Sequence, residues 1–285
     1  MINLLKYASK LLGIFLLLLL SFIYTEKVIN EARDNDPIMK SVIKYKKEND
    51  IRPEEPIING DELFLGVSGL LVNKKKSYKN MKKDNMFNDE KISYYKINPK
   101  TSITNNYNYF ITKGNNKKKY IAIIFKINSN RNIDSLLSLA KKNNVILNFF
   151  IDGAWLENNV DFAFKINSIG SEIYNLGYNN AYSKNMIKVT NNLIESITLK
   201  KSNLCLNEEK NNDYKEICKK NKMISITPLI NDFSITEVKK NLENGQMILY
   251  DLTTYDLTKF NLLISIIESR GYEITSLSKL INESN

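Results

Sequence analysis

Any catalytic chemistry in this chain must use side chains other than histidine, because its 285 residues include no histidine. Histidine is the commonest metal ligand and the usual general base near neutral pH. Its absence excludes a Ser-His-Asp triad and a histidine-ligated zinc site. Nucleotide chemistry has no support either, because the glycines are isolated and form no phosphate-binding loop.

The two cysteines, Cys205 and Cys218, are thirteen positions apart. Outside the membrane they could form a disulfide, whereas Cys218 lies in a helical stretch where a free buried thiol is equally compatible. A zinc site needs three or four ligands, and these two have no Cys or His companions. We therefore predict no metal and no cofactor, and the state of the cysteines stays open.

The positive charge does not indicate nucleic-acid binding. Lys and Arg total 41 against 31 Asp and Glu, which gives a net charge of +10, but only Arg33, Arg52, Arg131 and Arg270 are arginine. Nucleic-acid readers usually rely on arginine and concentrate their charge on one element. The lysines here are dispersed or in short runs, so we predict no nucleic-acid partner.

Residues 1–25 predict a membrane segment. Two lysines precede an apolar run from Leu11 to Leu20, which extends to Tyr24. A helix over this stretch would be about 21 Å long, shorter than a hydrocarbon core of about 30 Å, which favours a secretory signal. Residues 21–25 lack the small side chains of a cleavage site, which favours an uncleaved anchor. We expect a single-pass anchor with the N-terminus inside and the rest extracytoplasmic, and secretion after cleavage is the alternative.

The rest of the chain divides near residue 119. Residues 26–118 are polar and irregular, and they predict a stalk with a small N-terminal module. Between 119 and 285, buried strands alternate with amphipathic helices, which predicts about seven parallel βα units of an α/β fold. The expected strands are 120–127, 145–151, 172–175, 203–206, 223–227, 246–251 and 272–275. We expect a closed or partly closed (β/α) barrel with its site at the carboxyl ends of the strands, and an open doubly wound sheet is the alternative.

Five segments of this second region carry a family likeness. They are Ile121–Phe125, Asn148–Gly153, Gly170–Asn175, Gly245–Leu249 and Arg270–Leu277. In this order and spacing they resemble the polysaccharide deacetylases. The resemblance covers about residues 119 to 283 and implies a deformed (β/α) barrel. In active members it implies removal of acetyl groups from N-acetylated glycans such as peptidoglycan or chitin, with a metal held by one Asp and two His.

The chain departs from that family at the positions that the resemblance assigns to catalysis. Lys126 replaces the catalytic base, Ile127 replaces the metal-binding Asp, and Asp251 aligns with the acid His. Leu176 and Asn180 stand where the two metal-binding His are expected. Hydrocarbon side chains coordinate no ion. We therefore predict a degenerate member with no catalytic residue and no bound metal.

Lys126 offers a replacement for the lost positive charge. As a hypothesis, its ammonium lies near Asp251 at the barrel mouth and balances carboxylates that a dication would otherwise neutralise. The alternative is a lysine that extends into solvent.

The predicted strand ends also carry carboxylates, amides and aromatic rings. Sugars are bound by hydrogen bonds from such groups, with an aromatic ring under the pyranose. The candidates for glycan binding are Asp152, Trp155, Asn175, Tyr178, Tyr250 and Asp251. Structural roles remain open, because Trp155 could pack in the core and Asp152 could cap the following helix.

Three classes of function follow from these residues and the resemblance. The first is a membrane-anchored, catalytically silent deacetylase-like protein that binds or organises cell-wall glycan. The second is a metal-independent glycan hydrolase that uses Asp152 and Asp251, which requires carboxylates about 5 to 9.5 Å apart. The third is a scaffold or interaction module, in which residues 30–118 dock a partner and an apolar plug of Ile127 and Leu176 fills the barrel mouth.

Overall fold

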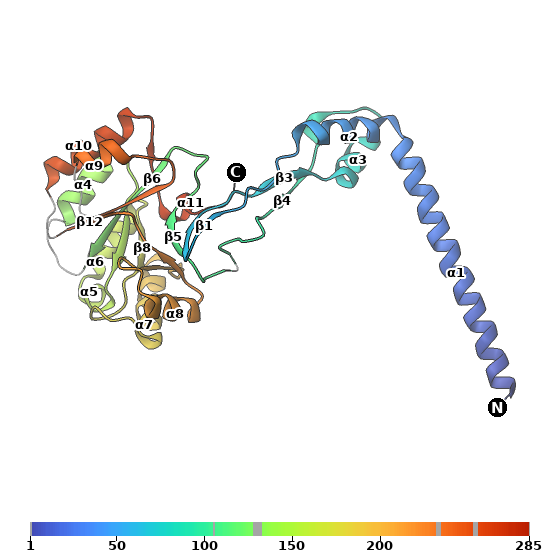
Figure 1. Cartoon of the computed structure of the whole chain (residues 1–285), viewed down its shortest axis with the longest axis horizontal. Coiled ribbons are helices and arrows are strands. Elements are labelled where there is room, and N and C mark those ends of the chain that lie inside the picture. The colour runs from blue at the N-terminus through green and yellow to red at the C-terminus, as the bar shows by residue number, and fades with distance from the viewer. Residues whose placement is uncertain (1, 105, 128–132, 232–234, 253–255, 285) are drawn as a thin grey trace. The chain divides into compact units, whose positions relative to one another are not determined.

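The chain forms two compact units, which are described separately (Figure 1). The first comprises residues 1–52 and 70–97, and the second comprises residues 53–69 and 98–285. The computed structural model describes residues 2–104, 106–127, 133–231, 235–252 and 256–284, without the side chains of 2–11, 231, 237 and 251.

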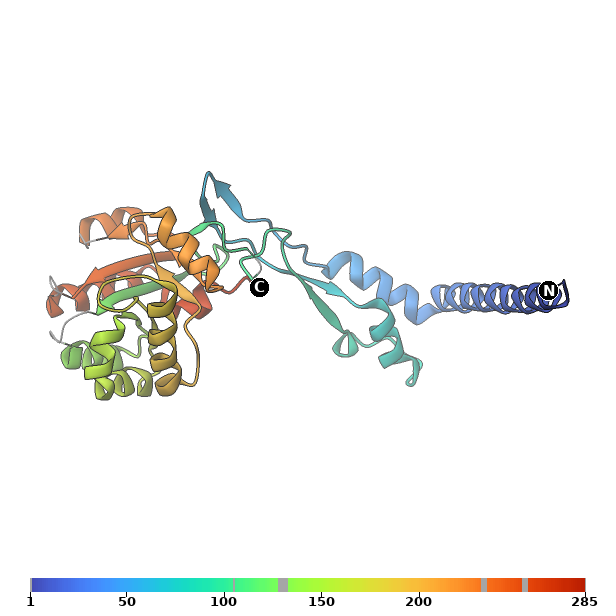
Figure 2. The same ribbon diagram turned by 90° about the horizontal axis from the view of Figure 1, so that it is seen from below.

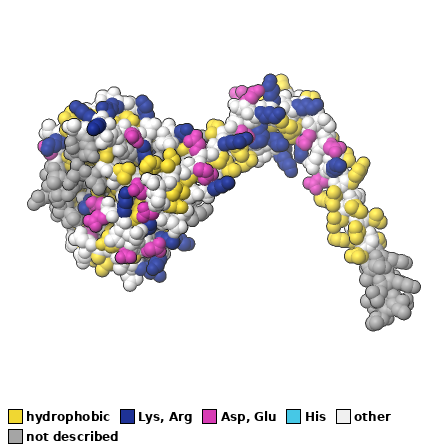
Figure 3. Space-filling view, viewed as in Figure 1, with side chains coloured by type: hydrophobic (Ala, Val, Ile, Leu, Met, Phe, Trp, Pro, Cys, Tyr) yellow, Lys and Arg dark blue, Asp and Glu magenta, His cyan; other side chains and the backbone are white. Residues whose placement is uncertain are grey.

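Helix α1 (Ile2–Asn35) begins the first unit. Its span from Leu12 to Asn35 has a mean hydropathy of 2.0 in its most apolar window, and none of that window is buried. Figure 3 shows hydrophobic side chains along the described part of this helix. By length and composition α1 is able to cross a membrane, and a signal sequence has the same properties. The expected apolar helix is therefore present, whereas its topology stays a prediction.

The rest of the first unit is more regular than its polar sequence suggests. Helix α2 (Pro37–Asn49) starts with a proline after Asp36, whose carboxylate accepts a hydrogen bond from Ile38 N at 2.9 Å. The unit also contains helix α3 (Lys74–Lys82), the 3-10 turn η1 (Asp89–Lys91) and the paired strands β3 (Gly69–Val72) and β4 (Tyr94–Ile97). Its buried cluster contains Ile38, Val42, Val72 and Met81. Helix α2 forms within the polar region because a few apolar residues at helical spacing suffice to bury one face.

A curled, mostly parallel sheet forms the second unit (Figures 1 and 2). Within the described residues its strand order is β1 (Ile57–Asn59), β2 (Glu62–Phe64), β5 (Phe110–Lys113), β10 (Ile224–Ile226), β9 (Leu204–Leu206), β8 (Glu172–Asn175), β7 (Asn148–Ile151), β6 (Tyr120–Ile127), β12 (Gln246–Asp251) and β11 (Ile230–Asn231). Strand β13 (Glu273–Ile274) also pairs with β6. Only the β1–β2 pair is antiparallel among the pairs described for this sheet.

Helices cover one face of this sheet, which we call the helix face. They are α4 (Ile133–Asn143), α5 (Gly153–Asn158), α6 (Val160–Ser168), α7 (Lys184–Thr198), α8 (Asn212–Lys220), α9 (Ile235–Asn241) and α10 (Leu257–Ser269). The other face, the inner face, carries a second buried cluster that includes Leu63 of β2 and Leu277 of the short helix α11 (Leu277–Leu280). Side chains of β6 alternate between the two, with Phe125 and Ile127 on the helix face and Ile124 on the inner face.

The predicted α/β fold is confirmed, with one difference. All seven strands expected between residues 120 and 275 are present, and the curled sheet corresponds to the partly closed form of the expected barrel. The sheet begins before residue 119, because β2 and β5 pair with each other and β5 pairs with β10 in parallel. Strand β5 lies in polar sequence, so its apolar pattern is too brief to predict a strand that pairs with a later part of the chain.

Candidate functional site

Lys126 and Glu208 form an ion pair at the carboxyl ends of the parallel strands. Lys126 lies near the end of β6 and Glu208 follows β9, and Lys126 Nζ donates to Glu208 Oε1 at 2.7 Å. Both side chains are about one-third exposed, at 31% and 32%. The hypothesis that Lys126 pairs with a carboxylate at the mouth is therefore supported with Glu208 as the partner. Asp251 is next to Lys126 in the β6–β12 register, but its side chain lies outside the described residues.

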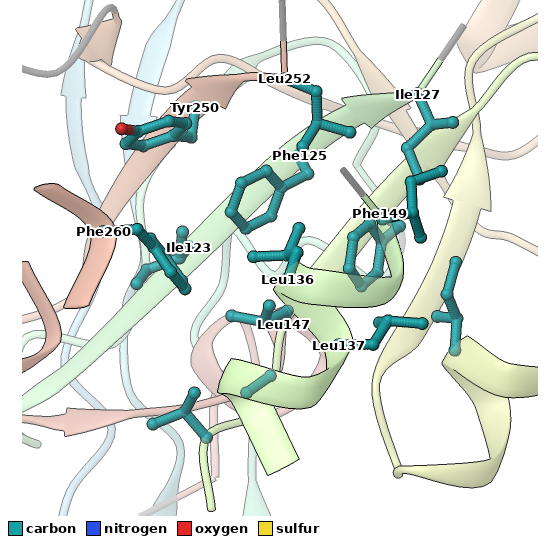
Figure 4. Close-up of a cluster of buried hydrophobic side chains, with 14 of the residues drawn as sticks. Ile123, Phe125, Ile127, Leu136, Leu137, Leu147, Phe149, Tyr250, Leu252 and Phe260 are labelled. Atoms are coloured by element: carbon teal, nitrogen blue, oxygen red, sulfur yellow. The ribbon is translucent and has the colours of Figure 1, made fainter. Parts of the chain in front are cut away.

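Ile127 and Leu176, the two aliphatic replacements, lie on opposite faces of the sheet. Ile127 is fully buried on the helix face, in the cluster that contains Phe125 and Phe149 (Figure 4). Leu176 is 7% exposed and belongs to the inner-face cluster. A single apolar plug made by both residues, as considered from the sequence, is therefore wrong. The reason is strand alternation, which turns Ile127 away from the face to which Lys126 belongs.

Asp152 joins two loops at this edge of the sheet. Its Oδ1 accepts hydrogen bonds from Ala154 N at 2.9 Å and Trp155 N at 3.3 Å, which caps helix α5. Its Oδ2 accepts a hydrogen bond from Asn180 N at 2.8 Å. The side chain is buried, with 4% of the residue exposed. The structural alternative for Asp152, a helix cap, is thus confirmed.

The two aromatic candidates Trp155 and Tyr250 are buried in the core. Trp155 packs on Phe162, with ring centroids 6.2 Å apart. Tyr250 lies on the helix face, with its ring centroid 5.6 Å from that of Phe125 and 5.9 Å from that of Phe260 (Figure 4). In this conformation neither ring is open to a sugar, because both residues are less than a tenth exposed.

Asn175 is fully buried beneath helix α7. Its Nδ2 donates to Ile187 O and to Asn191 Oδ1, both at 2.8 Å, while its Oδ1 accepts a hydrogen bond from Gly177 N at 2.7 Å. These bonds hold the turn after β8 in place. The amide is therefore used for internal structure.

Two partly buried tyrosines lie near the strand ends. Tyr178 is half-buried, and its hydroxyl donates to Glu157 Oε2 at 2.7 Å, a bond that raises the pKa of Tyr178. Tyr182 packs its ring 5.1 Å from that of Tyr214. Burial, followed by the nearby Glu208 carboxylate, raises the pKa of Tyr182 far above its usual value. Both hydroxyls are therefore neutral hydrogen-bonding groups at physiological pH.

We call Lys126, Asp152, Tyr178, Asn180, Tyr182 and Glu208 the strand-end site. The sequence named four of them and missed Glu208 and Tyr182. Glu208 follows the expected strand 203–206 by two positions, so the rule that sites lie at the carboxyl ends of parallel strands would have found it. Tyr182 follows a turn that runs through Asn179 and Asn180, both with positive φ, and no spacing rule points to it.

The strand-end site does not fit the divalent metal that the family resemblance implies. Ile127 and Leu176 offer only hydrocarbon, and the carboxylate oxygens of Asp152 already accept backbone N–H groups. The described residues contain no group of three His, Cys, Asp or Glu side chains able to hold a metal ion. No catalytic step through a metal follows from these residues.

The two loops joined by Asp152 give a test of its structural role. We expect Asp152→Ala to lower the free energy of unfolding by about 2 to 3 kcal/mol, because three backbone N–H groups lose their acceptor. Asp256 caps α10 through Thr258 N and Lys259 N. The control Asp256→Ala should lose only about 1 kcal/mol. Urea denaturation checks both values, and equal losses would contradict the role of Asp152 in joining the loops.

Cys205 and Cys218, whose state the sequence left open, form a disulfide. The bond ties β9 to α8 and is buried beside Ile187 and Met223. The segment between the cysteines carries Glu208. The disulfide therefore holds β9, the strand that Glu208 follows, against α8.

Known proteins share this fold. No family model matches the chain. The uncharacterized protein YlxY of Bacillus subtilis (strain 168) is 26% identical over 282 residues, which cover 90% of this chain and 86% of YlxY. BA3943 of Bacillus anthracis, described as a CE4 family pseudoenzyme, is similar with a TM-score of 0.64 and 20% identity, over 88% of this chain and 97% of that one.

A mutant of BA3943 with the same TM-score is described as having restored enzymatic activity. The Bc1960 peptidoglycan N-acetylglucosamine deacetylase is similar with a TM-score of 0.54 and 14% identity, over 61% of this chain and 94% of that one. At these identities the structures establish the fold. The chain therefore has the fold of the CE4 deacetylases and pseudoenzymes, which confirms the resemblance to polysaccharide deacetylases that its sequence indicates.

Proposed function

We propose that this chain is a catalytically silent deacetylase-like protein, anchored in the membrane by α1, that binds cell-wall glycan at its strand-end site. The observation that carries the proposal is the chemistry of that site. Where the resemblance requires a base and metal ligands, the chain has an ion-paired Lys126, the buried aliphatic side chains of Ile127 and Leu176, and Asn180. A metal-dependent deacetylation lacks its donors there.

Two features support an extracytoplasmic location. Helix α1 has the length and hydropathy of a membrane span. The disulfide between Cys205 and Cys218 fits an oxidising compartment, because cytosolic proteins seldom keep such bonds. Together they favour a protein held at the outer side of the membrane, next to the cell wall.

Glycan binding is supported by the exposed part of the strand-end site. Tyr178 offers a ring and a neutral hydroxyl, and the pair of Lys126 and Glu208 offers charged hydrogen-bonding groups to solvent. Sugar hydroxyls are bound by groups of these kinds. The structure does not favour the metal-independent hydrolase, because Asp152 is buried and both of its oxygens are bonded to backbone N–H groups.

Sedimentation with purified peptidoglycan tests the binding. The full chain in detergent should sediment with the glycan, and Tyr178→Ala should weaken retention about fivefold, the effect of one lost contact of about 1 kcal/mol. Lys188→Ala, an exposed residue on α7, is the control and should bind as the original chain does. Equal retention of all three proteins would contradict glycan binding at this site.

A measurement of acetate release tests whether the chain lacks deacetylase activity. We expect the full chain to release acetate from N-acetylated glycan at the uncatalysed rate, with or without added zinc. Acetate release above that rate, in a preparation free of other hydrolases, would refute the proposal that the protein is catalytically inactive.

A further inference from the structure

Helices α2 and α3 of the first unit concentrate the positive charge of this chain. Together they contain nine lysines, and their only acidic residue is Glu48. The strand-end site lies in the other unit and does not use this charge.

The lysines of α2 lie on one stripe. Lys40, Lys44 and Lys47 are exposed and follow the i, i+4, i+7 spacing of one helix face. Ile38 and Val42 on the opposite side are buried in the core of the unit. The buried side of α2 therefore forces these three ammonium groups into solvent.

The lysines of α3 are arranged in a similar way. Ser77 and Met81 face the core, while Lys74, Lys75, Lys76, Lys79 and Lys83 at its C-terminus are exposed. Within the part of the chain that the structure describes, no ion pair joins these five lysines to a carboxylate. Figure 3 shows the Lys and Arg side chains gathered over α2 and α3.

Asp36 connects α3 to the start of α2. Its carboxylate accepts hydrogen bonds from Lys82 Nζ at 2.6 Å and from Tyr78 hydroxyl at 3.0 Å, in addition to capping α2. The bond from Lys82, followed by that from Ile38 N, lowers the pKa of Asp36. The two lysine-bearing helices are thus held together at the residue that directly follows α1.

We propose that this lysine surface binds the anionic phospholipid headgroups of the membrane that α1 crosses. We define the surface as Lys40, Lys44, Lys47, Lys74, Lys75, Lys76, Lys79 and Lys83. The inference rests on the proposed anchor and adds a second contact with the bilayer. Lysine ammonium groups attract anionic headgroups within about one Debye length, which is about 8 Å at physiological ionic strength.

Chain length places the lysine surface within range of those headgroups. Asp36 is the single residue between α1 and α2. From Tyr24, where the apolar run ends, to Pro37 a helix rises about 20 Å, of which the headgroup layer occupies about 5 to 8 Å. The distance left between the headgroup layer and Pro37 is mostly spanned by a lysine side chain of about 6 Å together with the Debye length. A tilt of α1 shortens this distance further.

Lysine acetylation in nanodiscs tests the proposal with the full chain. The chain is inserted into discs of phosphatidylcholine, alone or with about 30% phosphatidylglycerol, and the acetylation rate of each lysine is measured by mass spectrometry. The lysine surface should react at least about threefold more slowly on the anionic discs, and about 0.5 M salt should remove the difference. Lys141 and Lys188 of the second unit are exposed internal controls and should react equally on both discs.

Three results would overturn the proposal. Equal rates for the lysine surface on both discs would show that anionic lipid does not contact it. Protection by soluble polyphosphate on phosphatidylcholine discs, without protection by phosphatidylglycerol, would assign the surface to a polyanionic polymer instead. Failure of the chain to enter discs at all would remove the anchor as well, and disc assembly is scored separately by size-exclusion chromatography.

Discussion

Replacing Ile127 by Asp should destabilise the second unit by about 3 to 5 kcal/mol, because it buries a carboxylate without a partner. Ile127 is fully buried on the helix face, among aromatic and aliphatic side chains (Figure 4). The resemblance assigns the metal-binding Asp to this position, so the substitution restores the family residue. In this chain the restored side chain meets hydrocarbon instead of an ion.

Chemical denaturation at several pH values measures this effect. The carboxylate of Ile127→Asp should have a raised pKa in the folded state, so the stability deficit should be largest at neutral pH and should shrink as the pH falls toward 4. Ile127→Val is the matched control and should lose only about 0.5 to 1.5 kcal/mol at every pH. A deficit for Ile127→Asp below 1 kcal/mol at pH 7 would show that the side chain escapes the core.

Reducing the Cys205–Cys218 disulfide should cost about 3 kcal/mol of stability, since the bond closes a loop of 13 residues. The disulfide reduces the number of conformations open to the unfolded chain, and this restriction is lost when the thiols are free. We expect a lower urea midpoint for the reduced protein and for the double variant Cys205→Ala/Cys218→Ala.

Thiol titration in denaturant without reductant provides the check on the bond itself. The oxidised protein should show no titratable thiol, and two thiols should appear after reduction. Lys126→Met is the control and should give the same thiol counts, since this variant removes the ion pair with Glu208 and leaves both cysteines in place. Two thiols per chain in protein exported to an oxidising compartment would contradict the disulfide.

The second half of the fold could be predicted from the sequence because each strand is locally apolar. The segment from Tyr120 to Ile127 is almost entirely apolar, and it forms β6 with the bounds expected. Strand β5 is different, since Phe110–Lys113 is only four residues long and is surrounded by polar sequence. It is stabilised by pairing with β2 and β10, and the β10 pairing comes from more than a hundred residues further along the chain. Local pattern carries no information about such partners.

Residue types named candidates for the site, and the fold decides what each of them contacts. The absence of histidine removes the two metal-binding His that the resemblance implies, and Ile127 removes the Asp. Asn175 and Tyr250 have the chemistry of sugar-binding groups, yet both face the helices and are buried, because strand alternation decides which side chain faces outward. For Lys126 the sequence left open a carboxylate partner, with Asp251 as the candidate, or extension into solvent, and the folded chain brings Glu208 to it.

The ammonium of Lys126 has one further consequence, which concerns metal ions in the surroundings. A bound ion can be stripped by a chelator or exchanged for a competing ion, whereas a lysine side chain is covalently part of its strand. The charge balance with Glu208 is therefore complete as soon as the chain folds. Scarcity or excess of transition metals in the surroundings leaves this end of the sheet unchanged.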